Sequence, residues 1–228
     1  MKFKAIAKAS LALGMLATGV ITSNVQSVQA KAEVKQQSES ELKHYYNKPI
    51  LERKNVTGFK YTDEGKHYLE VTVGQQHSRI TLLGSDKDKF KDGENSNIDV
   101  FILREGDSRQ ATNYSIGGVT KSNSVQYIDY INTPILEIKK DNEDVLKDFY
   151  YISKEDISLK ELDYRLRERA IKQHGLYSNG LKQGQITITI TMNDGTTHTI
   201  DLSQKLEKER MGESIDGTKI NKILVEMK

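Results

Sequence analysis

The segment that decides the fold, residues 154–177, reads KEDISLKELDYRLRERAIKQHGLY. Ser158 stands three residues before Glu161, which is the spacing of a capping box at the N-terminus of a helix. Apolar residues then recur at helical intervals, at Leu159, Leu162, Leu166 and Ala170, with Ile171 beside them. Gly175 can adopt the left-handed conformation that ends a helix. The segment therefore predicts one amphipathic helix whose apolar stripe packs on a sheet.

The charged residues of this helix lie outside the apolar stripe. Their spacing predicts that they face solvent, as the polar side of an amphipathic helix usually does. They are Lys160, Glu161, Asp163, Arg165, Arg167, Glu168, Arg169 and Lys172. We therefore expect this side of the helix to be solvated surface rather than a ligand site.

The other C-terminal segments complete an α+β pattern. Strands are predicted for residues 133–140, 185–191, 197–202 and 220–227, with a hairpin at Asp194-Gly195. A short helix is predicted for residues 203–212, capped by Ser203 and ended by Gly212. This order of elements is typical of a sheet that grips a helix.

The N-terminal half predicts a small unit made mainly of strands. A short helix is expected over residues 40–49, capped by Ser38 or Ser40. Strands follow at residues 55–61, 67–73, 78–84, 98–104 and 113–119, and the polar residues 85–97 are predicted to form a loop with one helical turn. The pattern favours a β-barrel or sandwich, with the boundary between the halves near residues 130–134.

The first 30 residues have the pattern of a secretory signal. Lys2, Lys4 and Lys8 precede an apolar run from Ala9 to Ile21, and small residues end at Ala30. The run is shorter than the roughly 20 residues that a membrane-spanning helix needs. Residues 31–48 are expected to form a polar leader and the short helix.

The composition of residues 31–228 excludes several classes of function. This part holds 31 basic and 32 acidic residues, so it lacks the bulk positive charge of a nucleic-acid-binding protein. The chain has no cysteine, which excludes disulfides, thiol catalysis and cysteine-ligated zinc.

The sequence also lacks a recognisable catalytic, cofactor or metal motif. His198 and Asp201 are three residues apart on a predicted strand, so their side chains should point to opposite faces. Asp86, Asp88 and Asp92 do not have the spacing of a calcium-binding loop. We expect no enzyme activity, no cofactor and no metal site.

Two motifs resemble the signatures of staphylococcal and streptococcal superantigen toxins. The first consists of Lys154, Ile157, Leu162-Asp163, Arg167 and Leu176-Tyr177, with Ala170 in place of the family's leucine. The second is Ile116-Gly117-Gly118-Val119-Thr120, which lacks the family's usual tyrosine before the glycine pair and its later asparagine. The segments ITLLGSDKDKFKDG, YINTPILEIKK and ERMG are similar to the superantigen-like branch.

This resemblance implies a domain organisation. It implies an α+β fold in which an N-terminal OB-fold β-barrel, residues 49–132, precedes a C-terminal β-grasp domain, residues 133–228. Many true superantigens carry a zinc site and a cysteine loop that this sequence lacks. T-cell stimulation is therefore not expected.

The resemblance also implies a function by binding. Family members bind immunoglobulin Fc regions, complement components, Toll-like or chemokine receptors, and sialylated glycans. We expect a secreted immune-evasion protein that binds host immunoglobulin G Fc and blocks complement or Fc-receptor engagement. The alternative is a module that binds sialylated glycans on host glycoproteins, and other plasma or complement proteins are further possible partners.

Candidate ligand-binding residues come from analogy with an immunoglobulin-binding relative. Two polar segments, residues 60–64 and 104–109, are predicted to be exposed loops of the barrel. Tyrosine and arginine are frequent anchors of protein interfaces. The nominated residues are Lys60, Tyr61, Asp63, Arg104, Asp107 and Arg109. The alternative interpretation is that both segments are only soluble turns.

Overall fold

A computed structural model describes residues 37–105, 111–124, 129–178 and 186–227. The expected signal segment lies outside these residues. None of the described helices is long and apolar enough to cross a membrane.

The first half forms a six-stranded sheet, here called the first sheet. Its order is β5-β3-β2-β1-β4-β6, and only the β3–β5 pairing is parallel. The strands are β1 (Ile50–Asp63), β2 (Lys66–Val73), β3 (Gln76–Leu82), β4 (Gly93–Leu103), β5 (Thr112–Ile116) and β6 (Val119–Lys121). Two helices accompany it, α1 (Glu39–Tyr46) and the short α2 (Asp86–Lys89).

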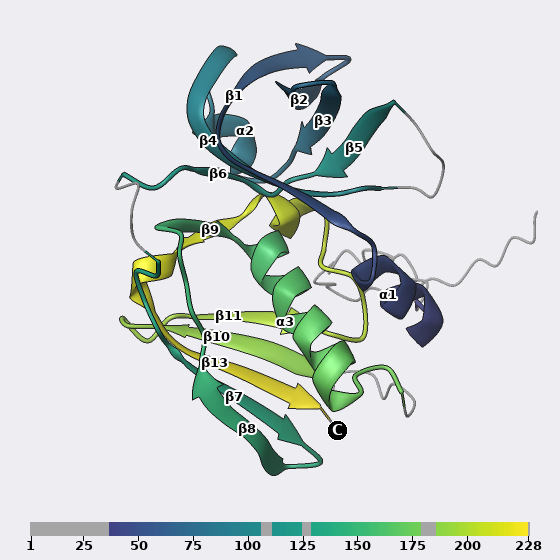
Figure 1. The fold of residues 1–228 in the computed structure, drawn as a ribbon, viewed down its shortest axis with the longest axis vertical. Helices are drawn as coiled ribbons and strands as arrows, with labels where there is room; N and C mark the ends of the chain where they lie inside the picture. Colours follow the sequence, from purple (N-terminus) through teal and green to yellow (C-terminus); the bar gives the residue numbers. More distant parts are fainter. Residues whose placement is uncertain (1–36, 106–110, 125–128, 179–185, 228) are drawn as a thin grey trace, which may run out of the picture. The chain divides into compact units, whose positions relative to one another are not determined.

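The second half forms a five-stranded sheet, the second sheet, with the order β11-β10-β13-β7-β8. Its strands are β7 (Ile135–Lys140), β8 (Glu143–Phe149), β10 (Thr187–Met192), β11 (Thr197–Asp201) and β13 (Ile220–Met227). The helix α3 (Leu159–His174) lies across one face of this sheet (Figure 1). A small separate ladder pairs β9 (Asp156–Ser158) with β12 (Ser214–Asp216), and two 3-10 turns complete the chain, η1 (Glu209–Gly212) and η2 (Gly217–Lys219).

Two of the three predicted helix starts, those of α1 and α3, are confirmed. Ser38 caps α1 in a capping box with Glu41. In α3 the hydroxyl of Ser158 accepts a hydrogen bond from the backbone N–H of Glu161 at 3.1 Å, and Gly175 ends the helix with φ +72°. A full capping box would also have the Glu161 carboxylate accept from the backbone N–H of Ser158. Here that carboxylate accepts instead from Lys154 at 2.7 Å and from Arg165 at 2.9 Å.

The apolar stripe of α3 is buried as predicted. Leu159, Leu162 and Ala170 are fully buried and Leu166 nearly so, in one core with side chains from β7, β10, β11 and β13. This core holds the helix on the second sheet.

We predict that Leu166→Ala lowers the free energy of unfolding by about 2–5 kcal/mol, the range for truncating a buried leucine. Urea denaturation would measure it. A loss below about 0.5 kcal/mol would show that the stripe contributes little to the core.

Half of the charged residues of α3 do not face solvent, which corrects part of the prediction. Lys160, Glu161, Asp163 and Arg167 are each at most 3% exposed. The ammonium group of Lys160 donates to the hydroxyl of Ser115 at 2.8 Å, on β5 of the first sheet. The helix is therefore covered on its apolar side and on much of its charged side.

Two local predictions were wrong, and one strand was missed. β4 begins at Gly93 rather than at residue 98, because residues 93–95 pair with residues 58–60 of β1. Residues 203–208 form no helix: the Ser203 hydroxyl and N–H both donate to Asp201, and only η1 is helical. β8 was not predicted, because this mostly exposed edge strand has no apolar alternation.

Asp86 is a buried carboxyl without a described partner. It is 1% exposed, and neither of its carboxyl oxygens has a hydrogen-bond partner among the described residues. Burial raises the pKa of Asp86 to about 8, with Lys89 opposing and Asp156 adding to the shift. Because the folded-state pKa exceeds the unfolded value, the folded state binds more protons between about pH 4 and pH 8, so stability from this group falls as pH rises.

We predict that Asp86→Asn raises the melting temperature more at pH 8 than at pH 5. Asn removes the ionisation while keeping the shape of the side chain. Thermal melting across this pH range would test it, with the exposed neighbour variant Asp88→Asn as the control. An unchanged pH slope in Asp86→Asn would contradict the assignment.

Candidate functional site

A row of side chains crosses the outer face of the first sheet. The strand register aligns Phe59 with Glu70, Glu70 with Arg79, and Arg79 with Tyr114. Directly opposed residues share a face, so these four side chains form one line over β1, β2, β3 and β5. Phe59 is 56% exposed and Tyr114 is 43% exposed. The row therefore presents an aromatic ring to solvent at each end.

A second row, formed by Tyr61 and Tyr68, lies beside the first and holds the Arg79 side chain in position. Tyr61 is opposite Tyr68, and their ring centroids are 5.6 Å apart. The Arg79 guanidinium lies 5.7 Å from the Tyr61 ring centroid and 5.4 Å from that of Tyr68. Contacts of this kind hold an arginine side chain in one orientation, and the guanidinium stays charged.

Glu70 connects the two rows. Its carboxylate accepts from the Tyr61 hydroxyl at 2.7 Å and from Arg79 Nε at 2.8 Å. Although desolvation acts in the opposite direction, these hydrogen bonds hold the pKa of Glu70 below its usual value. Burial and the bond to Glu70 raise the pKa of Tyr61 to about 12, so its hydroxyl remains a donor.

We call this set the aromatic face. It comprises Phe59, Tyr61, Tyr68, Glu70, Arg79 and Tyr114. The Tyr61 and Tyr68 rings and the Arg79 side chain are held by partners inside the set, so ordering them costs little side-chain entropy. Pre-ordered tyrosine and arginine side chains are the usual centres of protein interfaces.

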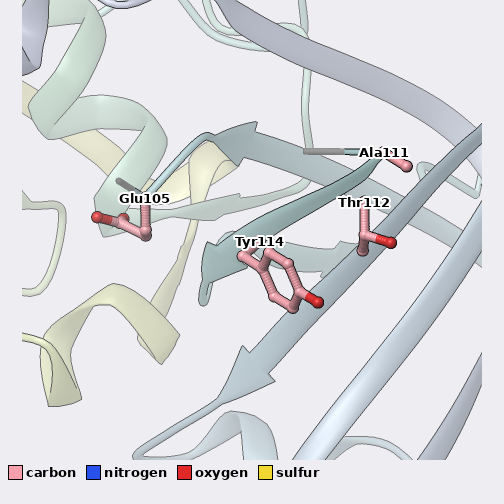
Figure 2. A pocket seen from close by; sticks show the side chains of 4 residues that line it. All are labelled: Glu105, Ala111, Thr112 and Tyr114. Carbon is pink, nitrogen blue, oxygen red and sulfur yellow. The ribbon is translucent and has the colours of Figure 1, made fainter. Parts of the chain in front are cut away.

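A depression of about 630 Å³ adjoins the aromatic face at Tyr114. Figure 2 shows the Tyr114 ring between Glu105 on one side and Thr112 with Ala111 on the other. Glu105 is anchored, because its carboxylate accepts from the Tyr45 hydroxyl at 2.9 Å and its N–H donates to the Tyr114 carbonyl at 2.9 Å. The hollow can receive a projecting side chain of a bound protein.

The structure distributes the nominated residues over several environments. Tyr61 belongs to the aromatic face, and Asp63 is exposed at the end of β1. Arg104 lies outside the face, where its Nε and Nη2 donate to the Asn113 side-chain oxygen at 3.2 and 2.6 Å. Asp107 and Arg109 lie outside the described residues.

Lys60 is the clear correction. Residues 60–63 belong to β1 rather than to a loop, and Lys60 is 7% exposed. Because it stands between Phe59 and Tyr61, strand alternation directs it to the opposite face. Its ammonium group donates to the carbonyls of Lys87 at 2.6 Å and Phe90 at 2.7 Å. Its role is therefore to hold the α2 segment.

Five members of the aromatic face were not nominated from the sequence, and they come from four different strands: Phe59, Tyr68, Glu70, Arg79 and Tyr114. The two-residue spacing of Phe59 and Tyr61 could have indicated a shared face. Glu70, Arg79 and Tyr114 come from other strands, so the strand register was needed to bring them together.

Two family models match the chain. The staphylococcal superantigen-like OB-fold domain matches residues 40–123, and the staphylococcal/streptococcal toxin β-grasp domain matches residues 131–227. The chain belongs to the staphylococcal superantigen-like family. The predicted α+β fold, an OB-fold domain followed by a β-grasp domain, is confirmed.

Relatives in this family cover the whole chain. Staphylococcal superantigen-like 1 of Staphylococcus aureus (strain Newman) is 99% identical over 228 residues, which is 100% of both chains. Staphylococcal superantigen-like 5 of the same strain is 43% identical over 231 residues, 98% of each chain. From the sequence alone, the member designated superantigen-like protein ten was expected to be most similar. That expectation is not supported, because the relative at 99% identity is a different member.

Solved structures show the same architecture. The crystal structure of putative exotoxin 3 from Staphylococcus aureus is 98% identical, has a TM-score of 0.81, and covers 84% of this chain and 100% of its own. The crystal structure of staphylococcal superantigen-like protein 5 complexed with sialyl Lewis X is 38% identical, has a TM-score of 0.78, and covers 84% and 100%. Within the described part of this chain, no group of three or more His, Asp or Glu side chains is placed to hold a metal ion.

Proposed function

We propose that this superantigen-like protein is a secreted, non-enzymatic immune-evasion factor whose aromatic face binds a host defence protein, with immunoglobulin G Fc as the ligand. Occupying that surface sterically blocks complement or Fc-receptor engagement. The pre-ordered cluster of Tyr61, Tyr68 and Arg79, with exposed Phe59 and Tyr114 beside it, is the observation that carries the proposal.

The geometry supports binding rather than catalysis. The Arg79 and Glu70 charges pair with each other at 2.8 Å, so the face presents little net charge and contacts a partner mainly through its rings. A steric inhibitor of this kind needs a stable interface and no reacting group.

The experiment measures the affinity of the chain for immunoglobulin G Fc by surface plasmon resonance. We predict that Tyr114→Ala weakens binding about thirtyfold or more, because truncating an interface anchor costs at least about 2 kcal/mol. The matched control is Tyr151→Ala, an aromatic residue that is 62% exposed and lies near the second sheet. Both variants must first show wild-type melting curves.

Two outcomes contradict the proposal. Equal affinities of Tyr114→Ala and Tyr151→Ala for Fc would place the contact outside the aromatic face. If the wild-type chain does not bind Fc, Fc is not the ligand, and the ligand would then be captured from human serum. If the Tyr114→Ala variant binds that captured protein as well as wild type does, the aromatic face is rejected too.

Sialylated-glycan binding through the second sheet is the second candidate. The crystal structures of superantigen-like protein 5 in complex with sialyl Lewis X favour it. In this chain the β10–β11 hairpin pairs Thr189 with Thr199 and Thr191 with Thr197, which gives it hydroxyl groups suited to sugars. Sialidase treatment of the captured host protein separates the candidates: binding that survives treatment excludes the glycan as the ligand.

A further inference from the structure

The open polar groups of the aromatic face are hydrogen-bond donors. Among the residues that the structure describes, the hydroxyls of Tyr68 and Tyr114 have no hydrogen-bond partner. Tyr68 is half-buried with its hydroxyl still open to solvent, and Tyr114 is 43% exposed. Arg79 contacts Glu70 through Nε and Nη2, which leaves its Nη1 without a partner in the described part of the chain. The face can therefore donate from two phenols and one guanidinium.

The one carboxylate of the aromatic face is already engaged. Oε1 of Glu70 accepts from the Tyr61 hydroxyl at 2.7 Å and from Arg79 Nε at 2.8 Å. A bound segment that brings N–H donors must compete with these two bonds, whereas a segment that brings only acceptors does not. Because Glu70 and Arg79 also neutralise each other, the face favours neither an acidic nor a basic segment.

A segment in the polyproline II conformation has this complementary character. It makes no internal hydrogen bonds, so its backbone carbonyls are free to accept, and its proline residues have no N–H to satisfy. Its pyrrolidine rings pack well on aromatic side chains. Proline also fixes the conformation before binding, so less entropy is lost when the segment is bound.

The dimensions of the aromatic face set the length of such a segment. Phe59 on β1 and Tyr114 on β5 are separated by β2 and β3 in the first sheet. Three steps of about 4.8 Å between neighbouring strands place these two residues about 14 Å apart. A polyproline II segment rises about 3.1 Å per residue, so about five or six residues cover this distance.

We propose that the aromatic face binds a proline-rich segment of its partner in the polyproline II conformation. Pyrrolidine rings of the segment pack on Phe59 and Tyr114. Its carbonyls accept from the hydroxyls of Tyr68 and Tyr114 and from the Arg79 guanidinium. This proposal rests on the function proposed above, because it uses the same face, and it adds the chemical class of the bound segment.

The test titrates two end-blocked, fluorescein-labelled peptides, APPAPPAPPA and ASSASSASSA, with the full chain and measures fluorescence anisotropy. Serine in place of proline restores backbone N–H donors and removes the fixed conformation. We expect APPAPPAPPA to bind at least about tenfold more tightly than ASSASSASSA, because it loses less entropy on binding.

Conservative variants test the donors without removing the rings. Tyr68→Phe and Tyr114→Phe should each weaken binding of APPAPPAPPA about fivefold, the usual effect of losing one hydrogen bond between neutral groups. Tyr114→Ala also removes a ring and should weaken it about tenfold or more. The matched control is Tyr151→Phe, which removes the hydroxyl of a tyrosine that is 62% exposed outside the aromatic face and should leave the affinity unchanged.

Equal binding of the two peptides would overturn the proposal, as would wild-type affinity in both Tyr68→Phe and Tyr114→Phe. Its failure is distinguishable from failure of the proposed function. If Tyr114→Ala weakens Fc binding but APPAPPAPPA does not bind, the face is the Fc contact and the proline-rich segment is rejected. If APPAPPAPPA binds and Tyr114→Ala weakens it while Fc does not bind, the segment class stands and Fc is rejected.

Discussion

Replacing Arg167 with methionine should lower the free energy of unfolding by about 3–5 kcal/mol, because the change leaves a buried carboxylate without its cation. Arg167 is fully buried, and its Nε donates to Asp163 at 2.5 Å. Its Nη1 donates to the Tyr177 hydroxyl at 2.6 Å, and its guanidinium lies 4.4 Å from the Tyr46 ring centroid. One side chain therefore links α3 with α1 and with the residues that follow the helix.

The loss in Arg167→Met should depend on pH. Burial raises the pKa of Asp163, and the Arg167 guanidinium acts against that shift. Without Arg167 the folded-state pKa of Asp163 rises further above its unfolded value, so the folded state is penalised increasingly as pH rises. The difference from wild type should be larger at pH 7.5 than at pH 4.5 in urea denaturation.

Arg169→Met is the matched control on the same helix. Arg169 contacts Asp148 at 3.2 Å on the protein surface, where ion pairs contribute about 0–1 kcal/mol. If Arg167→Met is no more destabilising than Arg169→Met, the buried network does not stabilise the fold. A double variant Arg167→Met/Asp163→Leu should recover part of the loss, because it removes the unpaired charge.

The sequence predicted α3 well on its apolar side and poorly on its charged side. Helical spacing identifies Leu162 and Leu166 as core residues because one sector of the helix carries all the apolar side chains. It cannot show that Lys160 and Arg167 meet partners from elements distant in the chain. Ser115, the partner of Lys160, lies on β5 of the first sheet, and Tyr46, whose ring lies against Arg167, belongs to α1. Periodicity within one helix contains no information about either residue.

The binding surfaces show the same limit. Tyr61 was nominated by analogy with a relative and because tyrosine is a common interface anchor, but Lys60 beside it was wrongly expected to lie in an exposed loop. Strand alternation gives opposite faces to consecutive residues, and this rule overrides the expectation that a lysine is exposed. Arg79 and Tyr114 join Tyr61 only through the pairing of separate strands. Local sequence patterns do not give that register.

The second large effect is expected at Gly117, in the motif that resembled a family signature. Gly117 has φ +55°, and a Cβ built on it would lie 2.0 Å from the carbonyl oxygen of Met211. The neighbouring N–H of Gly118 donates to that same carbonyl at 2.9 Å. The motif therefore brings the backbone after β5 directly against the backbone of η1, with no room for a side chain.

Gly117→Ala should lower the free energy of unfolding by about 2–5 kcal/mol, the combined cost of a left-handed non-glycine residue and of a steric clash in a packed interface. The clash is with backbone, so no side-chain rotation can relieve it. Gly74→Ala is the control: Gly74 has φ +59° but nothing within 4 Å of the added Cβ. It should cost only the backbone strain of about 1–2 kcal/mol. Equal losses in the two variants, measured by urea denaturation, would show that the contact with Met211 adds nothing to the strain.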